Sequence, residues 1–224
     1  MRPEQLELPF SWNVPCTLIQ DRVWYVLERA PSDFTFPGWS DPLLFGNTQP
    51  VCVEYCSGNG AWIAHRAQQN PQVNWVAVEK KFARARKIWS KIKNLQLDNL
   101  IVLCGEGHFA TQCYFPQNSI KEVFINFPDP WPKRRHAGNR LIQPAFTQQL
   151  HRVLEQQALL NFVTDDAAYS SWFISVMQAH GKFQSLYGPP FYTIEQPEYG
   201  SSYFEELWRS KARTIRYHQL RKTD

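Results

Sequence analysis

The chain has 224 residues, 43% of them hydrophobic, which suits one globular domain with a sizeable core. No apolar run approaches the roughly 20 residues needed to cross a bilayer, and the start lacks a signal-peptide region. The sequence therefore predicts a cytoplasmic protein without a membrane span.

The net charge of +4 is modest, but the basic residues are clustered. Of the 24 Lys and Arg residues, seven lie between residues 80 and 93, four between 133 and 140, and six between 209 and 222. Such clustering indicates a polyanion partner, whereas any single block is also typical of a solvated helix face. The five cysteines, an odd number, show no metal-binding spacing and predict neither disulfides nor a metal site.

In chain order, residues 1–50 are interpreted as an N-terminal extension packed on the main domain, with a short helix over residues 18–29. The main domain, residues 51–224, begins with a regular alternation. Strands are predicted at 51–55, 73–78, 100–103, 122–127 and 158–163, and helices at 61–69, 82–95, 146–154 and 167–179. This alternation predicts an α/β fold with a mostly parallel sheet and helices on both faces, whose ligands bind beyond the carboxyl ends of the strands.

The loop after the first main-domain strand carries Gly58 and Gly60, where glycine allows a tight turn and close approach to a ligand. A Gly-x-Gly alone is compatible with NAD, FAD or S-adenosylmethionine. The third glycine of the dinucleotide fingerprint is replaced by Ile63. Glu54, just before the loop, would repel a pyrophosphate but suits the ammonium and sulfonium charges of S-adenosylmethionine.

Two more acids follow the next strands. Glu79 lies nineteen residues past Gly60, where an acid accepts hydrogen bonds from both ribose hydroxyls of a nucleoside cofactor. Glu106, between Gly105 and Gly107, is within reach of the adenine end. Each acid alone is equally typical of an exposed loop, but three acids at three successive strand ends favour one shared ligand.

After the fourth strand comes a loop with prolines at 128, 130 and 132, followed by a basic segment. These prolines fix three φ angles and disfavour helix in the residue before each. The sequence therefore predicts a stiff extended loop that holds Asp129 beside the cofactor.

The stretch Phe127-Pro128-Asp129-Pro130-Trp131-Pro132-Lys133, with Arg135-His136 and Arg140-Leu141-Ile142-Gln143-Pro144 after it, resembles the signature of the bacterial tRNA (guanine-N7)-methyltransferases. The resemblance covers roughly residues 40–215. It implies a class I methyltransferase (Rossmann-like) fold, S-adenosylmethionine as cofactor, and methylation of the variable-loop guanine at position 46 of tRNA.

Carried over by position, the resemblance assigns residues to three roles. The catalytic residue would be Asp129, and the cofactor side would comprise Glu54, Gly58, Gly60, Glu79, Glu106 and Asp129. The substrate contacts would be Lys133, Asp165, Ser202 and Glu205. The sequence departs from the family at Cys56, where a glycine is usual, and at Val163, where a lysine is common.

The chemistry of guanine fits these assignments. N7 carries a lone pair and no proton, so its methylation needs alignment with the methyl donor rather than a general base. The product ring is cationic, and a nearby carboxylate would stabilise the developing charge. The sequence leaves open whether Asp129 or Asp165 reads the guanine N1–H and N2–H donors, and it assigns Lys133, Arg134 and Arg135 to the RNA backbone.

Two alternatives remain from the sequence alone: a methyltransferase of the same fold for another substrate, and a non-catalytic RNA-binding protein of that fold. Ile63 and Glu54 disfavour a nicotinamide dehydrogenase. The sequence does not predict whether the chain is a monomer or a homodimer.

Overall fold

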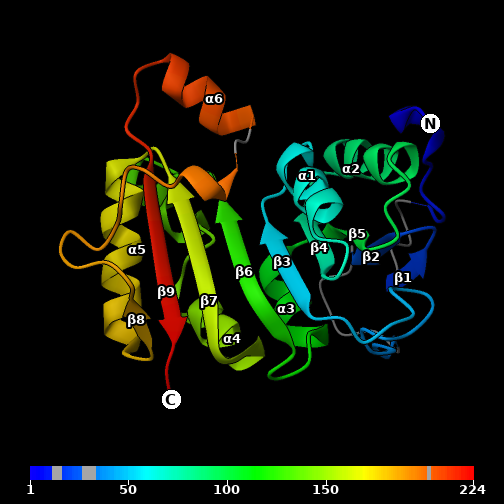
Figure 1. Ribbon diagram of the computed structural model, residues 1–224, viewed down its shortest axis with the longest axis horizontal. Coiled ribbons are helices and arrows are strands. Elements are labelled where there is room, and N and C mark those ends of the chain that lie inside the picture. Colours follow the sequence, from blue (N-terminus) through cyan, green and yellow to red (C-terminus); the bar gives the residue numbers. More distant parts are fainter. Residues whose placement is uncertain (12–16, 27–33, 201–202) are drawn as a thin grey trace. The chain divides into compact units, whose positions relative to one another are not determined.

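The computed structural model describes residues 1–11, 17–26, 34–200 and 203–224, and the chain divides into two units, Met1–Pro116 and Gln117–Asp224 (Figure 1). Strands alternate with helices in both. In the first unit the strand order is β1-β2-β5-β4-β3. Its strands are β1 Thr17–Gln20, β2 Val23–Val26, β3 Val51–Tyr55, β4 Asn74–Glu79 and β5 Leu100–Gly105.

The three central strands of the first unit are parallel and in close register. Tyr55 of β3 is opposite Val78 of β4, and Glu79 of β4 is opposite Cys104 of β5. Every residue of β3, β4 and β5 is buried, which explains their nearly continuous apolar sequences. The carboxyl ends of these three strands therefore meet at one edge of the sheet.

The helices of the first unit are α1 Ala61–Gln69, α2 Phe82–Asn94 and α3 Gly107–Tyr114, after a short 3-10 helix η1 Pro3–Gln5. Trp75 of β4 meets Trp62 of α1, with ring centroids 6.3 Å apart. Val78, three residues further along β4, faces Gly107 at the start of α3. Because side chains alternate along a strand, α1 and α3 cover opposite faces of the sheet, as the sequence predicts.

The prediction of a short helix over residues 18–29 is wrong for the part that the structure describes. Residues 17–20 and 23–26 form the antiparallel hairpin β1–β2, and β2 continues the parallel sheet beside β5. The residues between the strands, Asp21 and Arg22, have φ values of 50° and 68°, the left-handed turn that suits a two-residue hairpin. Residues 27–29 lie outside the described part, and the proposed domain boundary at residue 50 stays a prediction.

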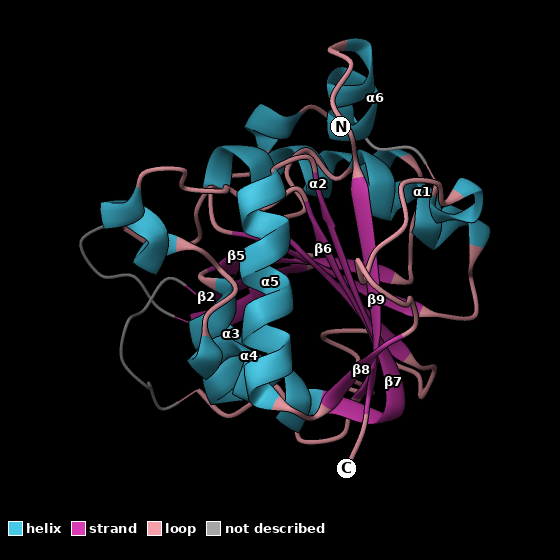
Figure 2. Ribbon diagram, turned by 90° about the vertical axis from the view of Figure 1, so that its left-hand side faces the viewer, coloured by secondary structure: helices cyan, strands magenta, loops and turns pink. Residues whose placement is uncertain are grey.

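The second unit has the strand order β6-β7-β9-β8, with β6 parallel to β7, and with β9 antiparallel to both β7 and β8. Its elements are β6 Ile120–Asn126, η2 Arg134–Asn139, α4 Pro144–Val153, β7 Leu154–Thr164, α5 Ala167–His180, β8 Phe183–Ser185, η3 Pro197–Tyr199, α6 Tyr203–Ser210 and β9 Arg216–Lys222. Figure 2 shows α5 running alongside these strands. The rings of Phe162 on β7 and Phe173 on α5 stack 4.3 Å apart in this core.

The predicted α/β class with mostly parallel strands is confirmed, and each predicted main-domain element is present within a few residues of its expected bounds. Helices α3 and α6, strands β8 and β9 and the hairpin β1–β2 were not predicted. Among the described residues, no helix is long and apolar enough to cross a membrane.

Candidate active site

The carboxyl ends of β3, β4 and β5 carry the three acids singled out in the sequence. Glu54 is the penultimate residue of β3 and is 2% exposed. Glu79 ends β4 and is 5% exposed. Glu106 directly follows β5. The structure thus brings Glu54, Glu79 and Glu106 to one edge of the first unit's sheet.

The loop between β3 and α1 is a tight turn held by hydrogen bonds to strand ends. The amide of Ser57 donates to the carbonyl of Val78 at 3.1 Å, and the amide of Gly60 donates to the carbonyl of Ser57 at 2.8 Å. Gly60 has φ 71°, and a Cβ there would lie 2.7 Å from Cγ1 of Ile88. Cys56 has φ 63°, so this cysteine adopts the left-handed backbone for which glycine is favoured.

Glu79 orients this loop directly. Its Oε2 accepts the amide of Gly58 at 2.9 Å, and its Oε1 accepts the amide of Lys81, which precedes α2, at 2.8 Å. Burial raises the pKa of Glu79, while the amide of Lys81 and the guanidinium of Arg84, 3.9 Å away, lower it. Each carboxylate oxygen keeps a second lone pair, so the predicted contact with ribose hydroxyls is compatible with this anchoring role.

Glu106 is the N-cap of α3. Its carboxylate accepts the amides of His108 at 3.2 Å and Phe109 at 2.6 Å. The adjacent glycines have a packing reason: a Cβ at Gly105 would lie 2.2 Å from the carbonyl oxygen of Val26 on β2. A Cβ at Gly107 would lie 3.0 Å from the ring of Tyr55. The glycines of this loop are therefore explained by packing, and the contact of Glu106 with the cofactor stays a prediction.

In the second unit, the proline-rich loop follows β6 with its backbone strained at both ends. Phe127 has φ 47° and donates its amide to the carbonyl of Val163 at 2.9 Å, and Trp131 has φ 44°. Such conformations are costly for aromatic residues and cluster at functional sites. Asp129 and Lys133 are both exposed, and Asp129 has no hydrogen-bond or ion-pair partner among the described residues.

Asp165, directly after β7, is engaged in an ion pair. Its carboxylate pairs with the guanidinium of Arg213, which also lies 4.3 Å from the ring centroid of Trp208 on α6. The carbonyl of Asp165 accepts from Arg216 at 3.4 Å. The side chain of Asp165 is 11% exposed, whereas Asp129 is free to meet a ligand.

Glu205, on α6, forms a network with β9. Its Oε1 accepts the hydroxyl of Tyr217 at 2.7 Å and Nε of Arg209 at 2.9 Å. Burial, and then the bond to Glu205, raises the pKa of Tyr217. Glu205 and Arg209 also line a hollow of about 290 Å³. Ser202, the other predicted substrate contact in this segment, lies outside the described residues.

The three basic blocks differ in their contacts. In the first, Arg86 donates to the carbonyls of Pro3 and Glu4 near the N-terminus, but several lysines are exposed. In the third, most members have internal partners: Arg209 binds Glu205, Arg213 binds Asp165, and Nζ of the buried Lys222 donates to the carbonyl of Leu154 at 2.7 Å. The third block is thus largely structural, and its predicted role in binding a polyanion is weakened. Among the side chains that the structure describes, the exposed members of the first two blocks are Lys80, Lys81, Arg84, Lys87, Lys133 and Arg135.

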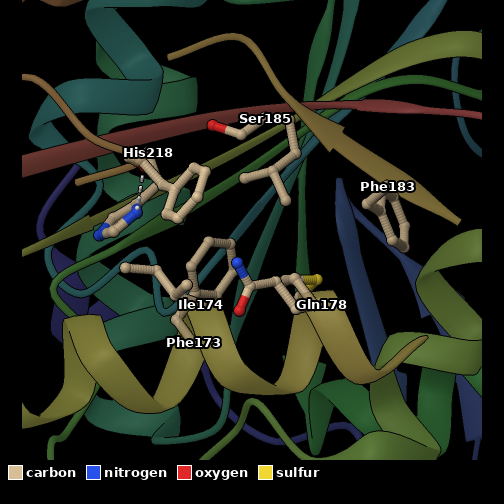
Figure 3. A pocket seen from close by; sticks show the side chains of 9 residues that line it. Phe173, Ile174, Gln178, Phe183, Ser185 and His218 are labelled. Carbon is tan, nitrogen blue, oxygen red and sulfur yellow. Dashed lines mark hydrogen bonds between the residues drawn. The ribbon is translucent and has the colours of Figure 1, made fainter. Parts of the chain in front are cut away.

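A second hollow, of about 210 Å³, lies between α5, β8 and β9 (Figure 3). Its lining is mainly apolar, with His218 at one end. His218 is 1% exposed and bonds through Nε2 to Ser170 and through Nδ1 to the carbonyl of Phe191, each at 3.0 Å. Burial lowers the pKa of His218 to about 4, so this pocket carries no charge at neutral pH and does not match a charged cofactor.

Two arginines of the second unit have contacts that were not foreseen. Arg213 neutralises Asp165, and Arg140 donates from Nε to the carbonyl of Pro130 at 2.8 Å. The sequence shows both only as members of basic blocks. Asp165 is 48 residues from Arg213, and the rings of Tyr169 and Trp172 are far along the chain from Arg140, so no local pattern indicates these pairings.

The fold belongs to the class I methyltransferases. A solved structure described as the 16S rRNA methyltransferase KamB aligns with a TM-score of 0.62 and 15% sequence identity, over 89% of this chain and 99% of that one. Residues 48–217 match the model of a family described as putative methyltransferase.

Closer relatives are found by sequence. A tRNA (guanine-N(7)-)-methyltransferase of Chlamydia muridarum (strain MoPn / Nigg) is 42% identical, over 96% of this chain and 95% of the relative. One of Chlamydia felis (strain Fe/C-56) is 41% identical, over 98% of this chain and 97% of the relative. The chain belongs to the tRNA (guanine-N7)-methyltransferase family.

Proposed function

We propose that this protein transfers the methyl group of S-adenosylmethionine to N7 of a guanine in tRNA, the guanine at position 46 of the variable loop, in the cytoplasm. The observation that carries the proposal is the 42% identity, over nearly the whole of both chains, to a relative with tRNA (guanine-N7)-methyltransferase as its name. The acids at the strand ends and the exposed Asp129 support it.

The groups of the first unit fit S-adenosylmethionine, which supplies an electrophilic methyl on a sulfonium when bound. The buried loop at Gly58 and Gly60 lies beside the end of β3, where Oγ of Ser57 donates to the carbonyl of Glu54 at 3.0 Å. The carboxylate of Glu54 is buried there and favours a cationic ligand. Glu79 fixes that loop through the amide of Gly58. We assign Glu106 to the same ligand. Glu106 is the N-cap of α3, and its carboxylate fixes the backbone that follows β5.

In the second unit we assign the guanine to Asp129. A carboxylate there would accept the N1–H and N2–H donors and stabilise the positive charge that develops on the ring. Asp165 is less suited, because Arg213 already neutralises it. We assign Lys133 to the RNA backbone, and Asp165, Ser202 and Glu205 to shaping the substrate side around it.

A non-catalytic RNA-binding protein of this fold would not need the buried acids of the first unit. A methyl-transfer assay separates the candidates. Purified protein, radiolabelled S-adenosylmethionine and unmodified tRNA should give 7-methylguanosine, identified by nuclease digestion and mass spectrometry. Binding of tRNA without methyl incorporation would contradict the proposal. If parallel assays with a protein or a small molecule as acceptor incorporate the methyl group and tRNA does not, the proposed substrate is wrong.

A further inference from the structure

The loop that carries Asp129 has a locally stiff backbone but few hydrogen bonds that anchor it to the rest of its unit. Pro128, Pro130 and Pro132 have no backbone N–H, so the loop cannot form a ladder of its own hydrogen bonds. Among the described residues, the one hydrogen bond to residues 128–132 comes from outside: Nε of Arg140 donates to the carbonyl of Pro130 at 2.8 Å. Trp131 also packs edge-to-face on His136, with ring centroids 5.9 Å apart, but the hydrogen-bonded anchor of this segment is Arg140.

The guanidinium of Arg140 is itself held by two rings of α5. It lies 5.2 Å from the ring centroid of Tyr169 and 5.6 Å from that of Trp172. Both rings are anchored to the backbone of Ile142. The hydroxyl of Tyr169 accepts the amide of Ile142 at 3.2 Å, and Nε1 of Trp172 donates to the carbonyl of Ile142 at 2.7 Å. Tyr169 is fully buried, so these supports belong to the core.

We infer that Arg140 is a positioning residue that fixes the Asp129 loop onto α5, an inference that rests on the proposed function for its effect on catalysis. The sequence groups Arg140 with a basic block expected to bind a polyanion. Its hydrogen bond and its two aromatic partners instead direct it into the protein. A stacked planar guanidinium with a directed Nε–H cannot be reproduced by a lysine, although the lysine keeps the charge.

This difference provides the test. Arg140→Lys should lower the single-turnover rate constant by roughly 10- to 100-fold, because a small displacement of a reacting group is costly. The KM for tRNA and the salt dependence of tRNA binding should stay near those of the parent. Trp172→Leu removes one of the two rings that support Arg140 and should lower the rate in the same way. The double variant should be little slower than either single variant, since both changes weaken one clamp, the contact of Arg140 with Pro130, Tyr169 and Trp172.

Limited cleavage by trypsin reports the mobility of the loop and does not depend on methyl transfer. The bonds after Lys133, Arg134 and Arg135 are tryptic sites next to the loop, and residue 140 is a tryptic site as either Arg or Lys. Native-state cleavage between residues 133 and 136 should be roughly fivefold or more faster in Arg140→Lys than in the parent, because local opening controls such cleavage. Thermal melts confirm folding, and Trp172→Leu serves for the same comparison if Arg140→Lys does not fold.

The matched control is Arg135→Lys and Arg135→Met, at an exposed basic residue of the same block. A phosphate contact is kept by lysine and lost in methionine, with a fall of about 0.7–0.9 in the salt slope of tRNA binding. If Arg140 follows that pattern, with parent-like rate and trypsin cleavage in Arg140→Lys, the clamp is wrong. If the parent fails to methylate tRNA, the proposed function fails, while the trypsin comparison still decides the clamp.

Discussion

Glu79 combines two tasks at the end of β4. Its carboxylate accepts the amides of Gly58 and Lys81, and we assign its remaining lone pairs to the ribose hydroxyls of the cofactor. Glu79→Ala should weaken S-adenosylmethionine binding by roughly 1–3 kcal/mol, the cost of leaving polar groups without a partner, and lower the melting temperature. Glu79→Gln, which keeps one acceptor, should be intermediate in both. Calorimetry showing parent affinity in Glu79→Ala would remove this residue from the site.

Asp129 tests mechanism rather than binding. Asp129→Asn keeps the size of the side chain and loses its charge, and the flanking prolines limit rearrangement of the loop. If the carboxylate stabilises the charge developing on guanine, the single-turnover methylation rate should fall by roughly a hundredfold or more. The affinities for cofactor and tRNA should change much less. A parent-like rate would make Asp129 a structural residue, and Asp165→Asn would then be expected to lose activity instead.

At the scale of elements, the edge of the first unit depends on close contact between β2 and β5. A Cβ at residue 105 would lie 2.2 Å from the carbonyl oxygen of Val26, which belongs to backbone that cannot move without breaking the pairing. Gly105→Ala should therefore destabilise the protein by about 1–3 kcal/mol, a typical cost of overpacking. Urea denaturation measures this, with Gly138→Ala as control, because a Cβ at Gly138 would meet open space. Equal stability of the two variants would contradict the observed β2–β5 pairing.

The contact between β9 and α5 makes stability depend on pH through His218. Its folded pKa of about 4 lies below the ordinary value near 6.5, so the folded state favours the neutral ring. The neutral ring of His218 therefore adds up to roughly 3 kcal/mol to the free energy of unfolding. This stabilisation is fully present above about pH 6.5 and is lost as the pH falls towards 4. Denaturation of the parent and of His218→Gln at several pH values should show a shallower slope in the variant between pH 6.5 and 4. Identical slopes would show that His218 does not titrate in this way.

The main-domain elements were predictable because their patterns are local. The β3–α1–β4–α2–β5 run has apolar strands and a helix with one apolar face, which signal their period within a few residues. The hairpin β1–β2 was mistaken for a helix because four-residue strands are too short to show alternation, and their turn uses Asp21 and Arg22 rather than glycine. Strand β9 is not predictable in the same way, because three of its seven residues are Arg or Lys and hide the apolar alternation that is typical of a strand.

The position of single acids in the candidate site was predictable from the sequence. The contacts between side chains far apart in the chain were not. Glu54 and Glu79 were expected at the carboxyl ends of strands, and the structure has both there. The bond of Glu79 to the amide of Gly58, the ion pair of Asp165 with Arg213, and the stacking of Arg140 on α5 involve residues remote in sequence. A single sequence contains no signal for such contacts, because they are set by tertiary packing.

At the scale of the whole molecule, the proposal requires that the acids of the first unit and the Asp129 loop of the second serve one reaction on tRNA. The exposed basic residues of the first two blocks fit a phosphate backbone, and the third block largely stabilises its own unit. The central claim is that the acceptor is N7 of one guanine. That claim can be tested by changing a single atom of the substrate.

The measurement uses two tRNAs that differ only at position 46, one with guanosine and one with 7-deazaguanosine, in which a C–H replaces N7. Both should bind the protein equally, since the Watson–Crick edge and the phosphates are unchanged. The guanosine tRNA should accept about one methyl group per molecule, and the 7-deaza tRNA none, because no lone pair is present to attack the methyl donor. Equal methylation of both tRNAs would show that the protein modifies another atom or another residue, and would contradict the account.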